Sequence, residues 1–251
     1  MAPAAILLKY VLVRDKYKRE PMRLITITFI LGCLGIIPAT IIESLLGSSN
    51  ILVTAFLYVA TVEESVKYLA VRAKAYHSSN FNEVMDGIVY GVAAGLGFAT
   101  VENILYVLGF GTISTAIIRA FMSVPSHAAY AGIMGFFVGM AKSYSQGSKQ
   151  HERRLIITGI IIAILLHGFY DTIAFSLEGL GGLAGLLGVT AISWIIFLRL
   201  IKKALSLSPI RWGTSGTLHV YPNRFCTQCG FQRETGSRFC VNCGQALEQP
   251  F

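Results

Sequence analysis

Carboxylates and histidines interrupt several long apolar stretches of this chain, and these residue types can activate water. Glu63 and Glu64 are adjacent in one stretch, Glu102 lies in the next, and His127 and His167 lie in two later ones. An ionisable side chain in the hydrocarbon costs about 3 kcal/mol on insertion scales, so its presence there indicates function by default. Peptide hydrolysis needs a general base, an oxyanion stabiliser and a proton donor for the leaving amine. These five residues can supply those roles if their helices meet.

Three further polar residues accompany this set. Lys67 follows the first glutamate by four residues, so an ion pair on one helix face partly neutralises the glutamate pair. Asp171 follows the second histidine at the same spacing, where a carboxylate can orient the imidazole and raise its basicity. Asn103 adjoins the third glutamate, and this pair either joins the reaction or connects helices by hydrogen bonds.

Two mechanisms fit these residue types. In the first, a glutamate acts directly as the base on water. In the second, histidines and carboxylates hold Zn²⁺, which lowers the pKa of its bound water to about 7. No HExxH motif occurs in the sequence, so a metal site would have to be assembled across helices. A serine nucleophile is the weaker alternative, because Ser123 and Ser126 lie near a histidine but no nucleophile motif surrounds them.

The composition places these residues in a membrane protein. Hydrophobic residues make up 54% of the 251 residues and charged residues only 14%, whereas a typical soluble domain is about 25% charged. The shorter apolar stretch 2–13, interrupted by Lys9, predicts a tilted or partly inserted anchor helix. A helix needs about 20 apolar residues to cross a bilayer. Six stretches meet this requirement and predict an all-α polytopic fold: Leu24–Leu46, Ile51–Val71, Gly87–Phe110, Ile113–Ala141, Leu155–Phe175 and Leu183–Ile201.

The basic residues predict the orientation of these spans. The segments 9–23, 72–85, 142–154 and 199–211 carry 16 Lys and Arg together, and the intervening turns 47–50, 109–112 and 176–182 carry none. By the positive-inside rule, the basic segments and the tail after Ile201 are cytoplasmic. Counting about 1.5 Å per residue from each outer end puts Glu102 and His167 roughly 12 Å deep. The same count puts Glu63 roughly 18 Å and His127 roughly 21 Å deep, in a hydrocarbon core about 30 Å thick.

Small and helix-breaking residues predict how the spans pack. Gly87, Gly91 and Gly95 recur every four residues in one span, and two glycines at 135 and 139 have the same spacing in the next span. Small residues at this spacing let helix backbones approach closely. Pro125 removes the backbone hydrogen bond to the fourth residue back. Irregular backbone at this depth is tolerated only beside protein or water, which predicts a hydrated cavity at His127.

Three other charged residues are expected to have structural roles. Arg119 lies close to the outer surface, where its long side chain can reach the interface. Glu43 lies near the outer end of the first span and is expected to be solvated. Asp86 opens the third span, where a helix N-terminus favours a carboxylate, so we expect it to cap the helix.

The last residues of the chain form a separate polar unit. The run FCTQCGFQRETGSRFCVNCG at 225–244 has the spacing C-x2-C-x10-C-x2-C with near-duplicated halves. Two such knuckles supply four thiolates to a tetrahedral structural zinc, here Cys226, Cys229, Cys240 and Cys243. We therefore predict a membrane body at 1–203, a linker at 204–222 and a cytoplasmic zinc ribbon at 223–247. The ribbon suits docking of a cytoplasmic protein, whereas three nearby arginines are too weak a footprint for nucleic acid.

Several motifs of the body resemble the PrsW family of prokaryotic intramembrane proteases. They are RDKYKREP (14–21), VEESVKYLAVRAKAYHSSNFNEVMDGIVYG (62–91), GFATVENILY (97–106), RAFMSVPSHAAYAGIMGFFVG (119–139) and LLHGFYD (165–171), and the resemblance covers roughly 3–203. More distantly, the motifs are similar to the superfamily of CAAX prenyl proteases and bacteriocin-processing proteins.

The resemblance implies an activity and assigns roles to residues. It implies a cell-membrane endopeptidase that cuts a membrane-anchored substrate such as an anti-sigma factor on its extracytoplasmic side, as the first step of regulated proteolysis. Glu63 and Glu64 match the family's paired glutamates and Lys67 its basic residue, while the histidines match its two histidine motifs. We interpret Glu63 as the base, assisted by Glu64, with Asp171 orienting His167. If the site holds a metal, its ligands are expected among His127, His167, Glu64 and Asp171, with Glu102 and Asn103 as further participants.

Two other classes of protein fit the buried charges. A transporter or channel could use the acidic residues as a proton or cation path, but the two halves of the body show no internal repeat, which transporters usually have. An inactive membrane sensor could signal through the zinc ribbon, but the chain has every acid and histidine of the matched motifs.

Overall fold

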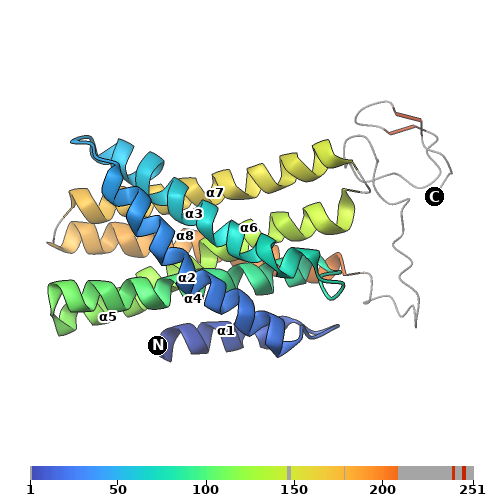
Figure 1. The fold of residues 1–251 in the computed structure, drawn as a ribbon, viewed down its shortest axis with the longest axis horizontal. Coiled ribbons are helices and arrows are strands. Elements are labelled where there is room, and N and C mark those ends of the chain that lie inside the picture. The colour runs from blue at the N-terminus through green and yellow to red at the C-terminus, as the bar shows by residue number, and fades with distance from the viewer. Residues whose placement is uncertain (1, 146–147, 178, 209–238, 241–244, 247–251) are drawn as a thin grey trace.

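The computed structural model describes residues 2–145, 148–177, 179–208, 239–240 and 245–246. In them the chain forms a bundle in which most long helices run along one axis of the molecule (Figure 1). An isolated bridge between Phe239 and Ala246 is the one β pairing in this described part. The helical elements are α1 (Ala2–Arg14), α2 (Met22–Leu45), η1 (Val53–Ala60), α3 (Thr61–Ala73), η2 (Ala75–His77), α4 (Val84–Phe110), α5 (Ile113–Phe121), α6 (Ser123–Tyr144), α7 (Lys149–Ser176) and α8 (Gly179–Ser206).

The described residues contain five helical stretches that are long and apolar enough to cross a membrane: α2, α4, α5 together with α6, α7 and α8. The expected span 51–71 is helical throughout, and the π-helix η1 continues without a gap into the α-helix α3. Because each of these two elements is shorter than a span, the stretch is not among the five, and its crossing of the membrane stays a prediction.

The expected span 113–141 is divided into α5 and α6. The two helices meet at Met122, whose φ of −109° and ψ of −62° depart from regular helix geometry. Pro125 accounts for the break because its ring nitrogen cannot donate a hydrogen bond to the preceding turn. The helix resumes at once, since Ser126 N donates to Met122 O at 3.1 Å.

The short helix α1 lies along the bundle. Its 13 residues extend for about 20 Å, which is less than the hydrocarbon thickness of about 30 Å. Ala4 and Val11 are its buried residues, and the helix packs against α4 and α6. The expected short helix is therefore present, and it is too short to cross a bilayer by itself.

Helix α4 is the centre of the bundle. Its most apolar 18-residue window is 94% buried, against 33% for α2 and 22% for α8. It packs mainly against α6 and α2, with further contacts to α1, α3 and α5. Because α4 is covered on nearly all sides, residues on several of its faces are inside the protein rather than in lipid.

The glycine pattern of α4 and α6 sets how closely these two helices approach. A Cβ added at Gly87 would lie 2.6 Å from Gly139 N, and one at Gly91 would lie 3.1 Å from Gly135 Cα. Contacts this short between backbones leave no room for a side chain, so the predicted close packing is confirmed. Glu102 on α4 and His127 on α6 are brought together by this crossing.

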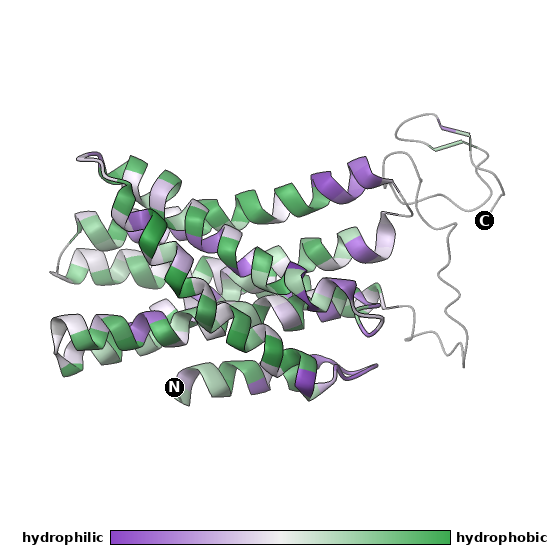
Figure 2. Ribbon diagram, in the orientation of Figure 1, coloured by the Kyte–Doolittle hydropathy of each residue, from purple (hydrophilic) through white to green (hydrophobic). Residues whose placement is uncertain are grey.

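The two ends of the bundle differ in polarity. The C-terminal ends of α1, α3, α6 and α8 lie at one end, together with the start of α2, α4 and α7 (Figure 1). Figure 2 shows that hydrophilic residues concentrate at this end. The helices therefore bring together the basic segments that were predicted to be cytoplasmic. Asp86 caps α4 at this end as expected, since its Oδ2 accepts hydrogen bonds from Asn82 N and Glu83 N.

Most of the expected zinc ribbon and linker lies outside the described residues, including Cys226, Cys229 and Cys243. Helix α8 continues to Ser206, so the first residues of the expected linker are helical. Within the expected ribbon, Cys240 is buried and its backbone N donates to Gln245 O at 2.8 Å.

Candidate active site

Three charged residues of α3 point into the bundle directly after the π-helical segment. The π-helix η1 ends at Ala60, and the hydroxyl of Thr61 donates to Phe56 O at 2.7 Å. Such segments are rare and occur frequently at functional sites. The residues that follow are almost completely buried, with Glu63 4% exposed and both Glu64 and Lys67 0% exposed.

The ammonium of Lys67 is the centre of the cluster. Its Nζ donates to Glu64 Oε1 at 2.7 Å and to Glu63 Oε2 at 3.1 Å, so the predicted ion pair is present and includes both glutamates. It also lies 2.8 Å from His127 Nδ1. Because an ammonium can only donate, this Nδ1 is an acceptor and the ring proton of a neutral His127 is on Nε2. Nε2 in turn lies 3.0 Å from Glu102 Oε2.

The second histidine is held by carboxylates on both ring nitrogens. His167 Nδ1 lies 2.9 Å from Glu64 Oε1. Its Nε2 lies 3.3 Å from Asp171 Oδ2 and 3.9 Å from Glu63 Oε2. The ring also stacks on Tyr130, with 5.5 Å between ring centres. The expected contact between His167 and Asp171 is therefore present, and Glu64 adds a partner on the opposite nitrogen.

The two histidines approach each other edge to face, with ring centres 5.1 Å apart. The structure thus brings residues from α3, α4, α6 and α7 into one buried cluster. The cluster contains Glu63, Glu64, Lys67, Glu102, His127, His167 and Asp171.

Part of this cluster has the donor set of a metal site. Glu63, His127 and His167 each offer one ligand atom, and the three atoms lie within 4.8 Å of one another. Two imidazoles and one carboxylate are the ligands of several catalytic zinc sites. Asp171 Oδ2 is buried without a hydrogen-bond partner beside the same histidine, so a cation there would satisfy it. The residues fit a metal, with Glu63 rather than Glu64 in the ligand group.

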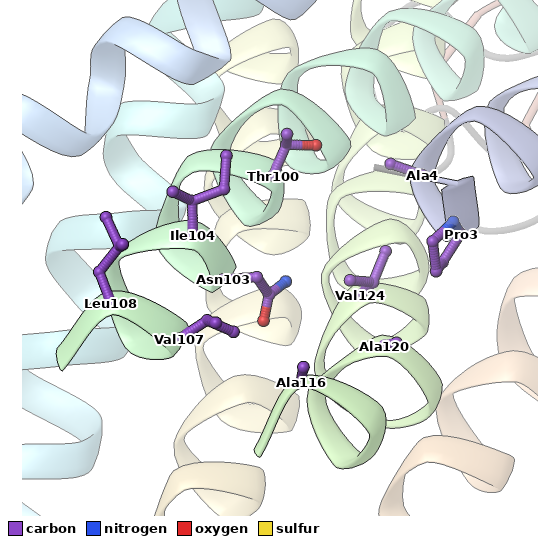
Figure 3. Close-up of a pocket in the computed structure, with 10 residues that line it drawn as sticks. All are labelled: Pro3, Ala4, Thr100, Asn103, Ile104, Val107, Leu108, Ala116, Ala120 and Val124. Carbon is purple, nitrogen blue, oxygen red and sulfur yellow. The ribbon is translucent and has the colours of Figure 1, made fainter. Parts of the chain in front are cut away.

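Asn103 does not join the buried cluster. Its Nδ2 donates to Ala99 O at 2.7 Å and its Oδ1 accepts from Arg119 Nε. The side chain points into a cavity of about 250 Å³ between α1, α4, α5 and α6 (Figure 3). The other lining residues are mostly apolar, with Thr100 as a second polar one. The predicted catalytic role of Asn103 is therefore not supported by direct contact with the histidines.

Two charged residues were expected to be peripheral but belong to the surroundings of the cluster. Arg119 Nη2 lies 2.9 Å from Glu102 Oε1, and its side chain is only 16% exposed. Glu43 on α2 has a buried Oε1 without a hydrogen-bond partner, and its charge is within electrostatic reach of Glu102 and His167. The sequence prediction for both residues rested on their position along a straight span, which is near the outer end. Depth does not show which side of a helix faces the protein, and the side of α5 that carries Arg119 faces Glu102 on α4.

A second group of carboxylates lies at the basic end of the bundle, away from the spans' interior. Asp15 and Glu20 are 3% and 5% exposed. Burial raises the pKa of Asp15 to about 6, and the neighbouring charge of Glu83 adds to this rise. Burial likewise raises the pKa of Glu20 to about 7, although a hydrogen bond from Tyr90 opposes the rise. These groups tie the segment after α1 to the start of α4.

Comparison with known proteins relates the chain to one family. Residues 20–201 match the family described as PrsW family intramembrane metalloprotease. Among similar proteins, Protease PrsW of Shouchella clausii is 35% identical over 81% of this chain and 94% of its own length. Protease PrsW of Geobacillus kaustophilus is 36% identical over 81% of this chain and 89% of its own length. Protease PrsW of Bacillus subtilis is 34% identical over 83% of this chain and 94% of its own length. No solved structure matches the chain.

Proposed function

Because the chain belongs to the PrsW family of intramembrane metalloproteases, we propose that its buried cluster is the site of peptide hydrolysis. The family membership makes the chain a peptidase and a multi-pass membrane protein that acts on membrane proteins. The observation that carries the site assignment is the grouping of Glu63, His127 and His167, whose ligand atoms lie within 4.8 Å of one another. These three residues come from three different helices, so the fold and not a local motif assembles them.

The proposed substrate is a membrane-anchored protein, such as an anti-sigma factor, cut in the extracytoplasmic half of the bilayer. Two arguments support this side. The basic segments gather at the opposite end of the bundle (Figure 2), which the positive-inside rule makes cytoplasmic. Glu102 on α4 and His167 on α7 also lie closer to the non-basic end when counted along their helices. Such a cut would be the first step of regulated proteolysis.

In the proposed mechanism, Glu63, His127 and His167 hold a zinc ion. When bound, zinc polarises the scissile carbonyl and lowers the pKa of a bound water to about 7. The neighbouring carboxylates prepare the histidines for this role. Glu64 accepts the Nδ1 proton of His167, and Glu102 accepts the Nε2 proton of His127. Each ring then has one unprotonated nitrogen. That of His127, Nδ1, accepts from Lys67 Nζ at 2.8 Å, so zinc would have to displace the ammonium from this nitrogen.

Asp171 is the carboxylate best placed to move the proton of the attacking water. Its Oδ2 is buried, has no hydrogen-bond partner and lies 3.3 Å from His167 Nε2. We propose that it accepts the proton as the oxygen of water bonds to the carbonyl carbon. The same proton then passes to the leaving nitrogen as the C–N bond breaks. Lys67 contacts both glutamates and compensates part of their charge.

A glutamic mechanism without metal is the alternative, with Glu63 taking the proton directly. Cleavage of a single-span fluorogenic substrate in micelles separates the two. The zinc mechanism predicts that a chelator abolishes cleavage by the wild type and that added zinc restores it. We expect His167→Ala and Asp171→Asn each to lower kcat by at least about 100-fold. Glu152→Gln is the matched control on α7, since Glu152 pairs with Arg72 outside the cluster. Full cleavage in chelator would reject the zinc mechanism.

For the tail we propose a cytoplasmic zinc ribbon that docks another protein. The support is the cysteine spacing at 226–243, which suits four thiolates around one structural zinc. A segment of this size folds only with its metal. Spectral titration of the full chain with Co²⁺ should show thiolate-to-metal absorption that Cys240→Ser removes.

A further inference from the structure

The side chain of Arg119 contacts four residues of the protein. Its Nη2 lies 2.9 Å from Glu102 Oε1 and donates to Ser123 Oγ at 3.2 Å. Its Nε donates to Asn103 Oδ1. The guanidinium also lies over the ring of Tyr106, 3.6 Å from the ring centre. Its Nε and Nη2 are directed at protein groups and the side chain is 16% exposed, so it does not extend to the lipid interface as its position in the sequence suggested.

The partner of Arg119 connects it to a histidine of the active site. One oxygen of Glu102, Oε1, faces Arg119, and the other, Oε2, lies 3.0 Å from His127 Nε2. Rotation of the carboxylate would break one of these contacts. The guanidinium therefore fixes the orientation of Glu102, and Glu102 fixes which nitrogen of His127 carries the proton.

We propose that Arg119 is a positioning residue for hydrolysis, which acts through Glu102 to keep the Nδ1 lone pair of His127 directed at the buried cluster. This inference rests on the proposed function of the cluster. The described partners of Arg119 do not include Glu63 or His167. Its proposed effect on the cluster therefore passes through Glu102.

Arg119 also connects helix α5 to the neighbouring helices. It lies in the last turn of α5, a helix without buried residues, and it binds α4 and the first turn of α6. Its contact Asn103 lines the cavity between α1, α4, α5 and α6 (Figure 3). A merely structural role, holding α5 in place, is therefore the competing explanation, and the experiment has to separate it from positioning.

The test compares Arg119→Gln and Arg119→Lys with Arg72→Gln in the full chain. Arg72 is the matched control, because it forms an ion pair with Glu152 and is 39% exposed. We measure the affinity of the body for Co²⁺, its visible absorption, and kcat and KM with a single-span substrate. Loss of an outer partner of a metal ligand typically costs about 10- to 100-fold in metal affinity or activity. We expect this loss in Arg119→Gln, with a changed Co²⁺ spectrum, little change in KM, and partial rescue in Arg119→Lys.

A double-mutant cycle with Glu102→Gln decides whether Arg119 acts through that carboxylate. Positioning predicts that Arg119→Gln/Glu102→Gln has no lower kcat than Glu102→Gln alone. Wild-type Co²⁺ affinity and kcat in Arg119→Gln would overturn the proposal, and so would additive losses in the double variant. If the wild-type body bound no metal, the zinc mechanism would fail, but the kcat cycle would still test Arg119.

Discussion

Replacing Gly95 by alanine tests whether the close approach of α4 and α6 sets the geometry of the site. Gly95 faces α6 directly beside the backbone of His127. A Cβ at position 95 would lie 2.8 Å from His127 O and 2.5 Å from Ala131 Cβ. Non-bonded carbon atoms prefer separations of about 3.5–4.0 Å. The two helices would therefore have to separate by roughly 1 Å at this turn.

That displacement acts on the contact between Glu102 and His127. Glu102 lies seven residues after Gly95 on α4, on the same face, and its Oε2 is 3.0 Å from His127 Nε2. A separation of about 1 Å would break this contact, and misplacement by this amount can lower the rate about 100-fold. Overpacking of the crossing should also destabilise the protein by about 1–3 kcal/mol.

The assay measures kcat with a single-span substrate and thermal unfolding in the same micelles. Gly188→Ala on α8 is the control, because a Cβ at 188 meets nothing within 4 Å and alanine in a helix is favoured over glycine by about 1 kcal/mol. We expect the control to be active and slightly stabilised. Partial recovery is expected in Gly95→Ala/Ala131→Gly, which removes one of the two close contacts. If Gly95→Ala were as active and as stable as the control, the crossing would not set the site geometry.

The remaining predictions concern charge and pH. Lys67→Met removes the cation between two buried glutamates, so we expect thermal unfolding to show a destabilisation of about 3–5 kcal/mol. The double variant Lys67→Met/Glu64→Gln should recover part of this loss. An unchanged unfolding temperature in Lys67→Met would contradict the ion-pair description. Burial raises the pKa of Asp15 to about 6 and of Glu20 to about 7, above the values near 4 of an unfolded chain. The folded protein thus binds more protons than the unfolded chain between about pH 4 and 7, and its stability should fall as the pH rises through this window. Protease resistance of the segment after α1 should be greater at pH 5 than at pH 8, and Asp15→Asn should weaken this pH dependence; equal resistance of the wild type at both values would contradict it.

Apolar length and basic loops were sufficient to predict the helical membrane body. At 51–71 they predicted the helical stretch but not its π-helical part, η1, because hydropathy does not reveal the register of the backbone hydrogen bonds. The division between α5 and α6 was foreseeable in part, since Pro125 lies just after the break.

The buried cluster was predictable as a set of residue types, and the structure adds which atoms meet. Spacing on one helix indicated the pairs of Lys67 with Glu63 and of Asp171 with His167, and both are present. The contact of His167 with Glu64 joins residues 103 positions apart, and no local spacing encodes it. Arg119 was assigned to the interface because depth was counted along one straight span. Depth does not show which way a side chain points around the helix, and Arg119 points at Glu102 on α4.

Zinc content per chain, measured by elemental analysis of the full-length protein and its His167→Ala variant, tests the proposed mechanism most directly. If Glu63, His127 and His167 hold a catalytic ion and the four tail cysteines hold a structural one, the wild type carries two zinc ions per chain. His167→Ala should then carry one and cleave no substrate. Equal zinc content in the two proteins, with chelator-treated wild type still cleaving its substrate, would contradict a metal at this site and assign the reaction to the glutamates alone.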